Sequence, residues 1–390
     1  MKQYNFDEIL DRRHTGSVKH DMMQPFWGTN DLLPMWVADM DFRSPDFVMD
    51  ALRQRCQHEV LGYSFGTDQY WDTMTAWLQR HYGITANASE MHYIPGIVAG
   101  IAFALQAFSA VGDRVLILTP VYPPFVNLPS GSGRTLVCSH LKIENGRFAI
   151  DFDDLRQKAR GCKMMIHANP HNPGGTVWSA DDLRQVAQIA AENNMLVIDD
   201  EIHADLTLPG YSHTAFPIVS QQAAEHCIMF YSPSKTFNIA GLSSSVCYIP
   251  NDDIRKRYFH YLDTYEVANG NVFAYVGAQA AFAHGEEWLQ QMLRYLAANV
   301  SLTADFLRSE MPQVKAVLPE ASYLAWLDFS DYGRTHAETQ RRLTEKARVA
   351  LNDGTTFGGP EYENHFRLNL GCPRATLQEA LERIKMAMVD

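Results

Sequence analysis

One lysine stands at the centre of the stretch Tyr231-Ser-Pro-Ser-Lys-Thr-Phe-Asn-Ile-Ala-Gly-Leu-Ser243. An apolar run, Cys227–Phe230, comes directly before it and predicts a short buried strand. If that strand belongs to a parallel sheet, Lys235 lies at the carboxyl edge, where folds of this kind bind ligands. A surface lysine that closes a strand is the simpler interpretation of this stretch alone, so the case for a site depends on the rest of the chain.

Length and composition are those of an ordinary globular protein with room for two domains. The 390 residues are 46% apolar and carry a formal net charge of −12 without any run of Lys or Arg, which argues against a nucleic-acid or anionic-membrane surface. The six cysteines have no paired spacing, as expected for reduced thiols. No signal-peptide core follows Met1 and no apolar stretch reaches membrane-spanning length, so we expect a soluble cytoplasmic protein.

Hydrophobic periodicity divides the chain into a large and a small domain. From about residue 91 to residue 285, short apolar runs alternate with amphipathic helical segments, which predicts an α/β fold with a mostly parallel sheet covered on both faces. A long helix from Glu286 and strands at 322–328 and 366–370 then predict a smaller α+β domain. We therefore predict an N-terminal segment (1–45) packed with the small domain, a large domain (46–285) and a small domain (286–390).

Capping residues predict where helices of the large domain begin. The string Ser44-Pro45-Asp46 predicts a helix start, with Ser44 as the cap and proline in the first turn. Leu61–Gly66 ends that helix, and a second helical segment reaches about Tyr82. Two further helices are expected, one from Pro95-Gly96 to about Phe108 and one capped by Ser179.

Polar clusters follow four of the predicted strands where each strand ends. They are Thr119-Pro-Val-Tyr122, Asn169-Pro-His-Asn-Pro-Gly-Gly175, Asp199-Asp-Glu-Ile-His203 and Ser232-Pro-Ser-Lys235. Each cluster alone has an ordinary explanation, because Asn-Pro-Gly forms turns and a terminal Asp often caps a helix. If the strands are parallel, however, all four tips open on one edge of the sheet, and a site is expected there.

The residue types at this edge fit the chemistry of pyridoxal phosphate (PLP). This aldehyde cofactor needs an amine for a Schiff base, a carboxylate beside its pyridine nitrogen, an acid or amide near its phenolic oxygen, and a flat partner for its ring. Its phosphate suits the free backbone N–H groups of a helix N-terminus such as Pro95-Gly-Ile-Val98. The sequence offers one candidate for each requirement.

With these strings in this order, the chain resembles the fold type I PLP enzymes of the aspartate aminotransferase superfamily. Within them it is similar to the MalY/PatB-type carbon–sulfur β-lyases, which include cystalysin and some bacterial cystathionine β-lyases. The resemblance extends from Ala38-Asp-Met-Asp-Phe42 to Arg367-Leu-Asn-Leu-Gly-Cys-Pro-Arg374. It implies the PLP-dependent transferase fold with a sheet of the seven-stranded type, a small amino-acid substrate, and a homodimer whose active sites lie at the subunit interface.

The resemblance also implies roles for residues that contact the cofactor ring. Lys235 matches the Schiff-base lysine, whose free amine later takes the Cα proton. Asp200, rather than Asp199, matches the carboxylate on the pyridine nitrogen, because the family string is Asp-Glu-Ile-His. Three further residues match contacts of the ring and its phenolic oxygen: Tyr122 (stacking), Asn172 (amide) and His203, where many relatives place a tyrosine.

The remaining roles concern the phosphate and the substrate. The amides of Ile97 and Val98, with the hydroxyls of Ser232 and Ser234, match the phosphate cup. Arg367 matches the arginine that binds the substrate α-carboxylate. Asp39 is expected to lie near a cleft, where it would bind substrate, or else to cap the next helix. Tyr63 matches a tyrosine that reaches the phosphate of the neighbouring subunit, and it is also expected to contact substrate. For Ser234 and Tyr63, a turn cap and core packing are the ordinary alternatives.

Ser243 bears on which reaction the site performs. Many aminotransferases of this superfamily carry an arginine eight residues after the lysine, whereas this chain has Ser243 there, as in the β-lyase branch. The resemblance therefore implies β-elimination of S-substituted L-cysteines to pyruvate, ammonia and a thiol. A class I/II aminotransferase is the alternative, and a non-catalytic regulatory protein on the same scaffold is the more remote one.

Other enzyme classes find little support in the sequence. Ser232-x-x-Lys235 fits the pattern of penicillin-recognising serine enzymes, but their Ser-Asp-Asn and Lys-Thr-Gly strings do not occur. No Gly-x-Gly-x-x-Gly string favours a dinucleotide fold. Neither Cys-x-x-Cys nor His-Glu-x-x-His occurs, so no metal site is expected.

Overall fold

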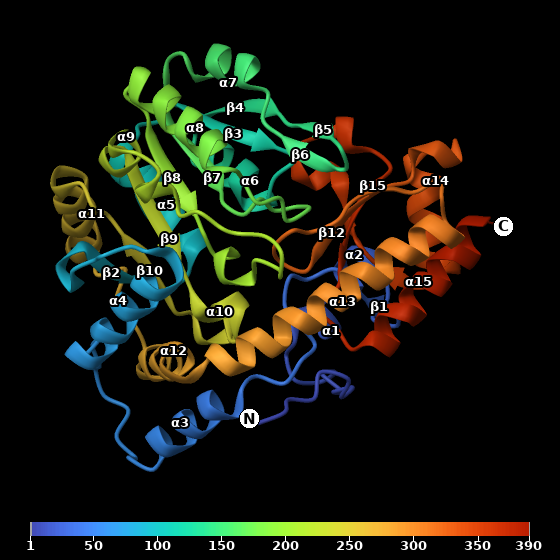
Figure 1. The fold of residues 1–390 in the computed structure, drawn as a ribbon, viewed down its shortest axis with the longest axis horizontal. Helices are drawn as coiled ribbons and strands as arrows, with labels where there is room; N and C mark the ends of the chain where they lie inside the picture. The colour runs from blue at the N-terminus through green and yellow to red at the C-terminus, as the bar shows by residue number, and fades with distance from the viewer. Residues whose placement is uncertain (1, 390) are drawn as a thin grey trace.

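A seven-stranded sheet forms the centre of the large domain in the computed structural model, which describes residues 2–389 (Figure 1). The strand order is β2-β10-β9-β8-β7-β3-β4, and only β10 runs antiparallel to its neighbours. The predicted α/β class and the mostly parallel sheet are thus confirmed. The strands are β2 (Met91–Ile94), β3 (Arg114–Thr119), β4 (Thr135–His140), β7 (Cys162–Ala168), β8 (Leu196–Asp200), β9 (Cys227–Tyr231) and β10 (Ser245–Tyr248).

Helices cover both faces of this sheet because successive strand residues point to opposite sides. In β3, Val115 and Ile117 join the apolar core beneath α5 and α11, whereas Leu116 and Leu118 join the core beneath α7 and α8. The helices of the large domain are α3 (Asp46–Cys56), α4 (Asp68–Tyr82), α5 (Ile97–Phe108), α6 (Pro123–Gly131), α7 (Phe152–Ala159), α8 (Ala180–Glu192), α9 (Gln221–Glu225), α10 (Pro233–Thr236), α11 (Asp252–Tyr265) and α12 (Val272–His284).

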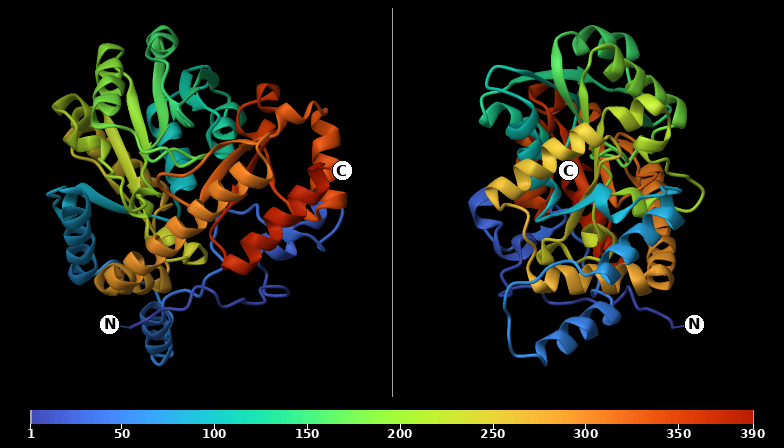
Figure 2. Two further views of the ribbon diagram at one scale, coloured as in Figure 1. Left: turned by 45° about the vertical axis from the view of Figure 1, so that its right-hand side comes forward. Right: turned by 90° about the vertical axis from the view of Figure 1, so that its left-hand side faces the viewer.

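A smaller antiparallel sheet, ordered β11-β12-β15-β14, lies beside the large domain (Figure 2). The predicted boundary at residue 285 falls between α12 and α13. The long helix α13 (Glu286–Glu310) runs from the large domain across the small one (Figure 1). The other small-domain elements are β11 (Lys315–Val317), β12 (Leu324–Asp328), α14 (His336–Arg341), β13 (Val349–Ala350), β14 (Asn352–Asp353), β15 (His365–Asn369) and α15 (Arg374–Val389).

The N-terminal segment contains α1 (Val18–Asp21), α2 (Gln24–Trp27) and β1 (Leu33–Pro34), and it binds to both domains. Strand β1 pairs in parallel with β13, as expected for a segment that packs with the small domain. The predicted capping role of Ser44 is wrong, because Pro45 occupies the N-cap position of α3. The Ser44 hydroxyl instead donates to the Asn238 carbonyl at 2.8 Å and so ties the segment to the large domain.

Two short strands of the sheet, β2 and β10, and the hairpin of β5 (Lys142–Glu144) and β6 (Arg147–Ala149) were not predicted from the sequence. Strand β10 follows a run of serines, and β2 contains only four residues, so neither has a distinctive apolar pattern. Their pairing is decided by tertiary contacts, since β10 fills the space between β2 and β9.

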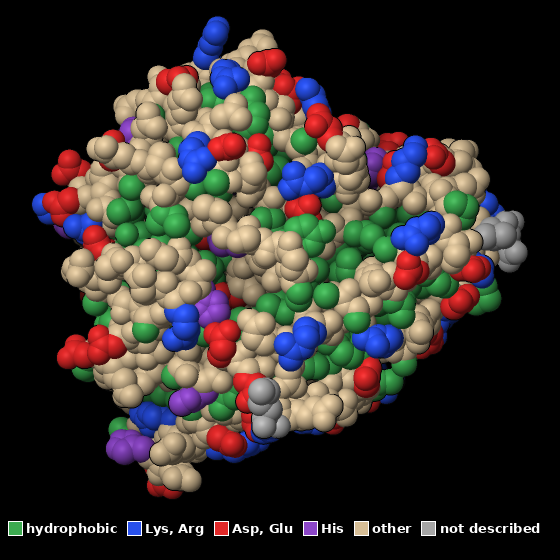
Figure 3. All heavy atoms as spheres, viewed as in Figure 1, with side chains coloured by type: hydrophobic (Ala, Val, Ile, Leu, Met, Phe, Trp, Pro, Cys, Tyr) green, Lys and Arg blue, Asp and Glu red, His purple; other side chains and the backbone are tan. Residues whose placement is uncertain are grey.

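The surface carries both kinds of charge. On the face drawn in Figure 3, the described Lys and Arg side chains are interspersed with Asp and Glu and form no continuous basic patch. Among residues 2–389, no helix has the length and apolar character that a membrane span requires.

Gly175 is expected to be sensitive to substitution because it joins the two domains at a left-handed position. Its φ is +63°, and its carbonyl accepts hydrogen bonds from the amides of Glu320 and Ala321. An added Cβ would lie 2.0 Å from the Ala321 carbonyl oxygen. Gly175→Ala should therefore lower the free energy of unfolding by at least about 3 kcal/mol, combining left-handed strain with a backbone clash.

Gly161→Ala is the matched control for this prediction. Gly161 has φ +72° and an added Cβ there would meet nothing within 4 Å, so only the strain of about 1–2 kcal/mol applies. Urea unfolding of both variants measures the difference. Equal losses of stability would contradict the proposed importance of the Gly175 contact.

Candidate functional site

The four strand tips and the N-terminus of α5 meet around one cavity of about 200 Å³. This confirms that the polar clusters open on a common edge of the sheet. The cavity is lined by Ala38, Pro95, Gly96, Ile97, Val98, Tyr122, Asn172, Asp200, Ile202, His203, Ser234, Lys235, Ala240, Ser243, Ser244 and Ser245.

Lys235 lies on α10, a single helical turn that begins where β9 ends. The Ser232 side chain caps this turn by accepting from the Ser234 amide at 3.1 Å. The Lys235 amine donates to the Ala38 carbonyl at 2.6 Å. Burial lowers the pKa of Lys235, and this shift is opposed by the nearby Asp39 carboxylate. The lysine therefore carries a less basic amine than an exposed lysine does.

Asp200 and Asp199 point to opposite sides of strand β8. Asp200 lines the cavity, and its Oδ1 accepts from the Ile202 amide at 3.0 Å. Burial raises the pKa of Asp200 to about 7, against the stabilising effects of that amide and of Lys235. Asp199 faces away and accepts from His167 at 2.6 Å. Only Asp200 can therefore contact a ligand in the cavity.

Asn172 connects the cavity to Arg367. Its Oδ1 accepts from Arg367 Nη1 at 3.1 Å, while its amide nitrogen has no hydrogen-bond partner among residues 2–389. Arg367 lies just outside the cavity lining and also donates to the Trp36 carbonyl and to Asn352. Burial lowers the pKa of Arg367 to about 10, and no acid forms an ion pair with it in the described chain. This guanidinium remains a cation, with its Nε buried and without an acceptor.

His203 and Tyr122 enter the cavity from different strand tips. Burial, followed by the charges of Lys235 and Arg367, lowers the pKa of His203 to about 3, so the imidazole is neutral near pH 7. Its Nδ1 is buried and has no partner in the described chain. Burial raises the pKa of Tyr122, which keeps the phenol protonated. The site thus offers an unpaired imidazole nitrogen and an aromatic ring.

The N-terminus of α5 closes one end of the cavity. Gly96 occupies the N-cap position with φ 153° and no side-chain cap, so the first amides of the helix, including those of Ile97 and Val98, have no side-chain acceptor. Four serines lie at the same end, and the Ser244 hydroxyl is buried without a partner in the described chain. No arginine lines the cavity among residues 2–389. An anion here would bind to helix amides and hydroxyls.

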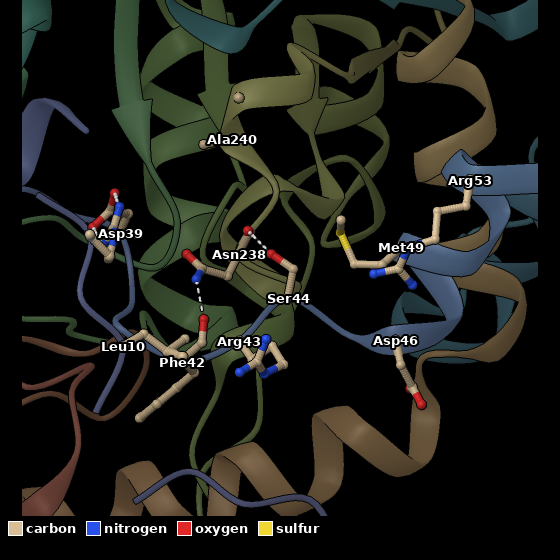
Figure 4. A pocket seen from close by; sticks show the side chains of 12 residues that line it. Leu10, Asp39, Phe42, Arg43, Ser44, Asp46, Met49, Arg53, Asn238 and Ala240 are labelled. Carbon is tan, nitrogen blue, oxygen red and sulfur yellow. Dashed lines mark hydrogen bonds and ion pairs between the residues drawn. The ribbon is translucent and has the colours of Figure 1, made fainter. Parts of the chain in front are cut away.

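Three other predicted residues lie outside the cavity lining. The Ser232 hydroxyl lies behind Ser234, with the two oxygens 2.8 Å apart, and it donates to the Ser244 carbonyl. Asp39 lines a neighbouring pocket of about 430 Å³, where both of its oxygens accept from Arg12 (Figure 4). Tyr63 is fully exposed on the loop between α3 and α4, which excludes core packing within this chain.

Several residues of the site were missed from the sequence. Two of them are Ala38 and Tyr323. The Ala38 carbonyl accepts hydrogen bonds both from Lys235 and from the Tyr323 hydroxyl, the latter at 3.0 Å. A backbone carbonyl leaves no signal in a sequence. Ser244 and Ser245 lie in the Ser243-Ser-Ser245 run, all of which lines the cavity, and the composition of this run is a usable signal in the sequence.

The unpaired atoms of the cavity fit PLP. Residues 2–389 contain no cluster of candidate metal ligands. The cavity instead presents an amine, a carboxylate, a neutral imidazole nitrogen and an unpaired hydroxyl beside a free helix N-terminus. These are the groups that a pyridine aldehyde with a phosphate requires, and each would gain a partner when the cofactor binds.

The raised pKa of Asp200 predicts a pH-dependent stability of the cofactor-free protein. A carboxyl whose pKa rises from 3.8 to about 7 on folding destabilises the folded state increasingly as pH rises through that range. Asp200→Asn should therefore gain stability over the parent between pH 4 and pH 7, by up to about 4 kcal/mol. Thermal unfolding of both cofactor-free proteins from pH 4 to pH 8 tests this, and a constant difference would contradict it.

Comparisons with known proteins agree with this geometry. The family model of class I and II aminotransferases matches residues 31–384. Cystathionine beta-lyase PatB of Bacillus subtilis is 40% identical over 98% of this chain and 100% of its own length. The structure of cystalysin from Treponema denticola, which contains PLP, has a TM-score of 0.95 at 31% identity and covers 100% of both chains.

A second solved structure, the PLP-bound C–S lyase from Staphylococcus hominis, has a TM-score of 0.92 at 36% identity and covers 100% of this chain and 99% of its own. The PLP-dependent transferase fold and the cofactor that the sequence predicted are thereby confirmed. The chain belongs to the PLP-dependent class I and II aminotransferase family, among the relatives of PatB and cystalysin.

Proposed function

We propose that this protein is a PLP-dependent carbon–sulfur lyase that cleaves S-substituted L-cysteines into pyruvate, ammonia and a thiol. The observation that carries the proposal is the convergence of Lys235, Asp200 and Asn172 on one cavity beside a free helix N-terminus. The relatives named cystathionine beta-lyase and C–S lyase support the choice of reaction. We also propose a cytoplasmic location, which the six free cysteines support.

Lys235 is the proposed covalent anchor and base. Its lowered pKa increases the fraction of neutral amine, which is the form that can attack an aldehyde or accept a proton. After substrate displaces the lysine, the amine takes the proton from the substrate Cα. The Ala38 carbonyl, 2.6 Å away, then orients the amine. The electrons of the Cβ–S bond leave with sulfur as a thiolate.

Bound PLP supplies an electron sink for the charge that develops at Cα. Ionised Asp200 would hold a proton on the pyridine nitrogen of the bound cofactor, and that positive charge would favour the ionised form of Asp200. The free amide of Asn172 and the neutral imidazole of His203 would form hydrogen bonds with the phenolic oxygen. Tyr122 would stack on the pyridine ring of the cofactor. We propose it as a catalytic residue together with Lys235 and Asp200.

The phosphate site is proposed at the N-terminus of α5. The amides of Ile97 and Val98 bind the phosphate, with Ser234 in the cavity wall and Ser232 directly behind it. This arrangement uses helix amides rather than the arginine that many aminotransferases place eight residues after the lysine, where this chain has Ser243.

Arg367 is the proposed ligand of the substrate α-carboxylate. It is a buried cation without an acid partner in the described chain, so a carboxylate would supply the missing opposite charge. Asp39 borders the adjacent pocket, where Figure 4 shows it across from Met49 and Arg53, with Asn238 and Ser44 between. We propose that substrate passes Asp39 on its way to the cavity. With the domain division that we propose at residue 285, Arg367 and Lys235 belong to different domains.

A homodimer with shared active sites is proposed from the loop between α3 and α4. This loop exposes Val60, Leu61, Tyr63 and Phe65, an apolar group that a second copy would cover. Tyr63 is 112% exposed and cannot reach the cavity of its own chain while it projects into solvent. We propose that Tyr63 completes the phosphate and substrate sites of the partner subunit.

The reaction is tested by incubating the PLP-loaded enzyme with L-cystathionine and no oxo acid. We expect stoichiometric pyruvate, ammonia and free thiol, because elimination needs only water as co-reactant. Strict dependence on an added oxo acid, with transfer of the amino group, would instead identify an aminotransferase. No turnover of any S-substituted cysteine by a PLP-loaded protein would favour a regulatory role.

The shared site is tested by mixing two inactive variants. Tyr63→Ala and Lys235→Ala are each expected to lose most activity as homodimers. In a mixed dimer, one of the two sites has both residues intact. Unfolding and refolding an equal mixture should therefore restore about a quarter of the wild-type activity, since half of random dimers are mixed. Absence of any recovery, with dimers confirmed by light scattering, would contradict the proposal that Tyr63 acts across the interface.

A further inference from the structure

Asp205 is a buried carboxylate outside the cavity, and three hydrogen-bond donors surround it. It lies in the 3-10 turn Ala204–Leu206, just after His203, and is 9% exposed. Its Oδ1 accepts from Trp77 Nε1 at 3.0 Å and from the Tyr82 hydroxyl, and its Oδ2 accepts from the Thr236 hydroxyl at 2.9 Å. All three of these donors are uncharged side chains. The donors alone stabilise this buried group.

These three donors come from two helices, of which one carries Lys235 and the other lies away from the cavity. Trp77 and Tyr82 belong to α4, which does not line the cavity. Thr236 is the residue after Lys235 and ends α10. Asp205 lies a few residues after the tip of β8, which carries Asp200 and His203. One carboxylate therefore links the Asp200 segment, the Lys235 turn and the α4 scaffold.

The Lys235 turn needs such an external link. A helix of four residues has almost no internal hydrogen bonds to fix its direction. The Ser232 hydroxyl holds its beginning through the Ser244 carbonyl. Its end is held by the bond from Thr236, whose side chain is completely buried, to Asp205. Backbone bonds from Phe237 to Pro233 and from Ile239 to Ser234 also close the turn, but the bond from Thr236 is the one that ties it to the Asp200 segment.

We propose that Asp205 is a positioning residue that, through Thr236, fixes Lys235 relative to Asp200. The inference rests on the proposed role of Lys235 as the cofactor lysine. Asp205 touches neither the cavity nor Lys235 itself, so its effect on Lys235 passes through the Thr236 hydroxyl. Loss of that hydroxyl should change how PLP is held, whereas loss of a donor on the α4 side should change stability alone.

Thr236→Val and Thr236→Ser form the main test, with Tyr82→Phe as the matched control. Valine has nearly the shape of threonine but cannot donate, whereas serine keeps the hydroxyl. Tyr82→Phe removes a donor from the same carboxylate without touching the Lys235 turn. The measurements are the dissociation constant for PLP, the visible absorbance of bound PLP with its pH midpoint, and kcat for the elimination.

We expect Thr236→Val to weaken PLP binding, shift the pH midpoint of the visible band and lower kcat by about tenfold or more, since small misplacements of a reacting group cost up to ~10²-fold. Thr236→Ser should stay close to wild type in all three measurements. Tyr82→Phe should lower the melting temperature while leaving the absorbance band and its midpoint unchanged. If Thr236→Val does not fold, Thr236→Ala, which adds no bulk, provides the same test.

Two results would overturn the positioning role. One is a Thr236→Val enzyme with wild-type PLP affinity, pH midpoint and kcat. The other is an equal change of these properties in Thr236→Val and Tyr82→Phe, because that would mean a general loss of structure. The visible band of Lys235→Ala is measured in parallel. It distinguishes failure of the positioning role of Asp205 from failure of the proposed function. Persistence of its visible band would refute the cofactor role of Lys235, whereas loss of the band with an unaffected Thr236→Val would refute only the role of Asp205.

Discussion

Burial of an amine and a carboxylate in one small cavity is the constraint on which the rest of the site depends. The desolvation that lowers the pKa of Lys235 also raises that of Asp200 to about 7. Burial thus disfavours the charged form of both groups until a ligand enters. A cofactor with an aldehyde and a basic ring nitrogen relieves both penalties, because it consumes the free amine and provides a cation for Asp200.

The architecture delivers this arrangement through parallel strands. The tips of β3, β7, β8 and β9 place side chains from distant parts of the sequence on one edge. The small domain contributes Arg367, and the N-terminal segment contributes the Ala38 carbonyl that Lys235 contacts. Asn238 secures that segment by bonding to the backbone of Met40 and Phe42. Polar side chains thus hold in place the backbone that contacts Lys235.

The sequence allowed the parallel sheet and the cavity to be predicted because both leave local signals. Continuous apolar runs indicated the strands, and the polar residues directly after them indicated the edge. Other features depend on tertiary pairing. Ser44 has the composition of a helix cap, yet it bonds to Asn238, and Asp205 receives hydrogen bonds from residues 128 and 31 positions away. A local stretch of sequence does not contain both members of such a pair, so these bonds could not be predicted. The Ala38 carbonyl could not be predicted either, because every residue has a backbone carbonyl.

Borohydride trapping shows directly whether Lys235 is the residue to which the cofactor bonds. The PLP-loaded protein is reduced with borohydride, digested, and analysed by mass spectrometry for lysines that carry a pyridoxyl group. We expect the modification on Lys235, in the peptide that contains Ser232–Ser243, and on no other lysine to a comparable extent. Modification of a different lysine, with Lys235 recovered unmodified, would contradict it.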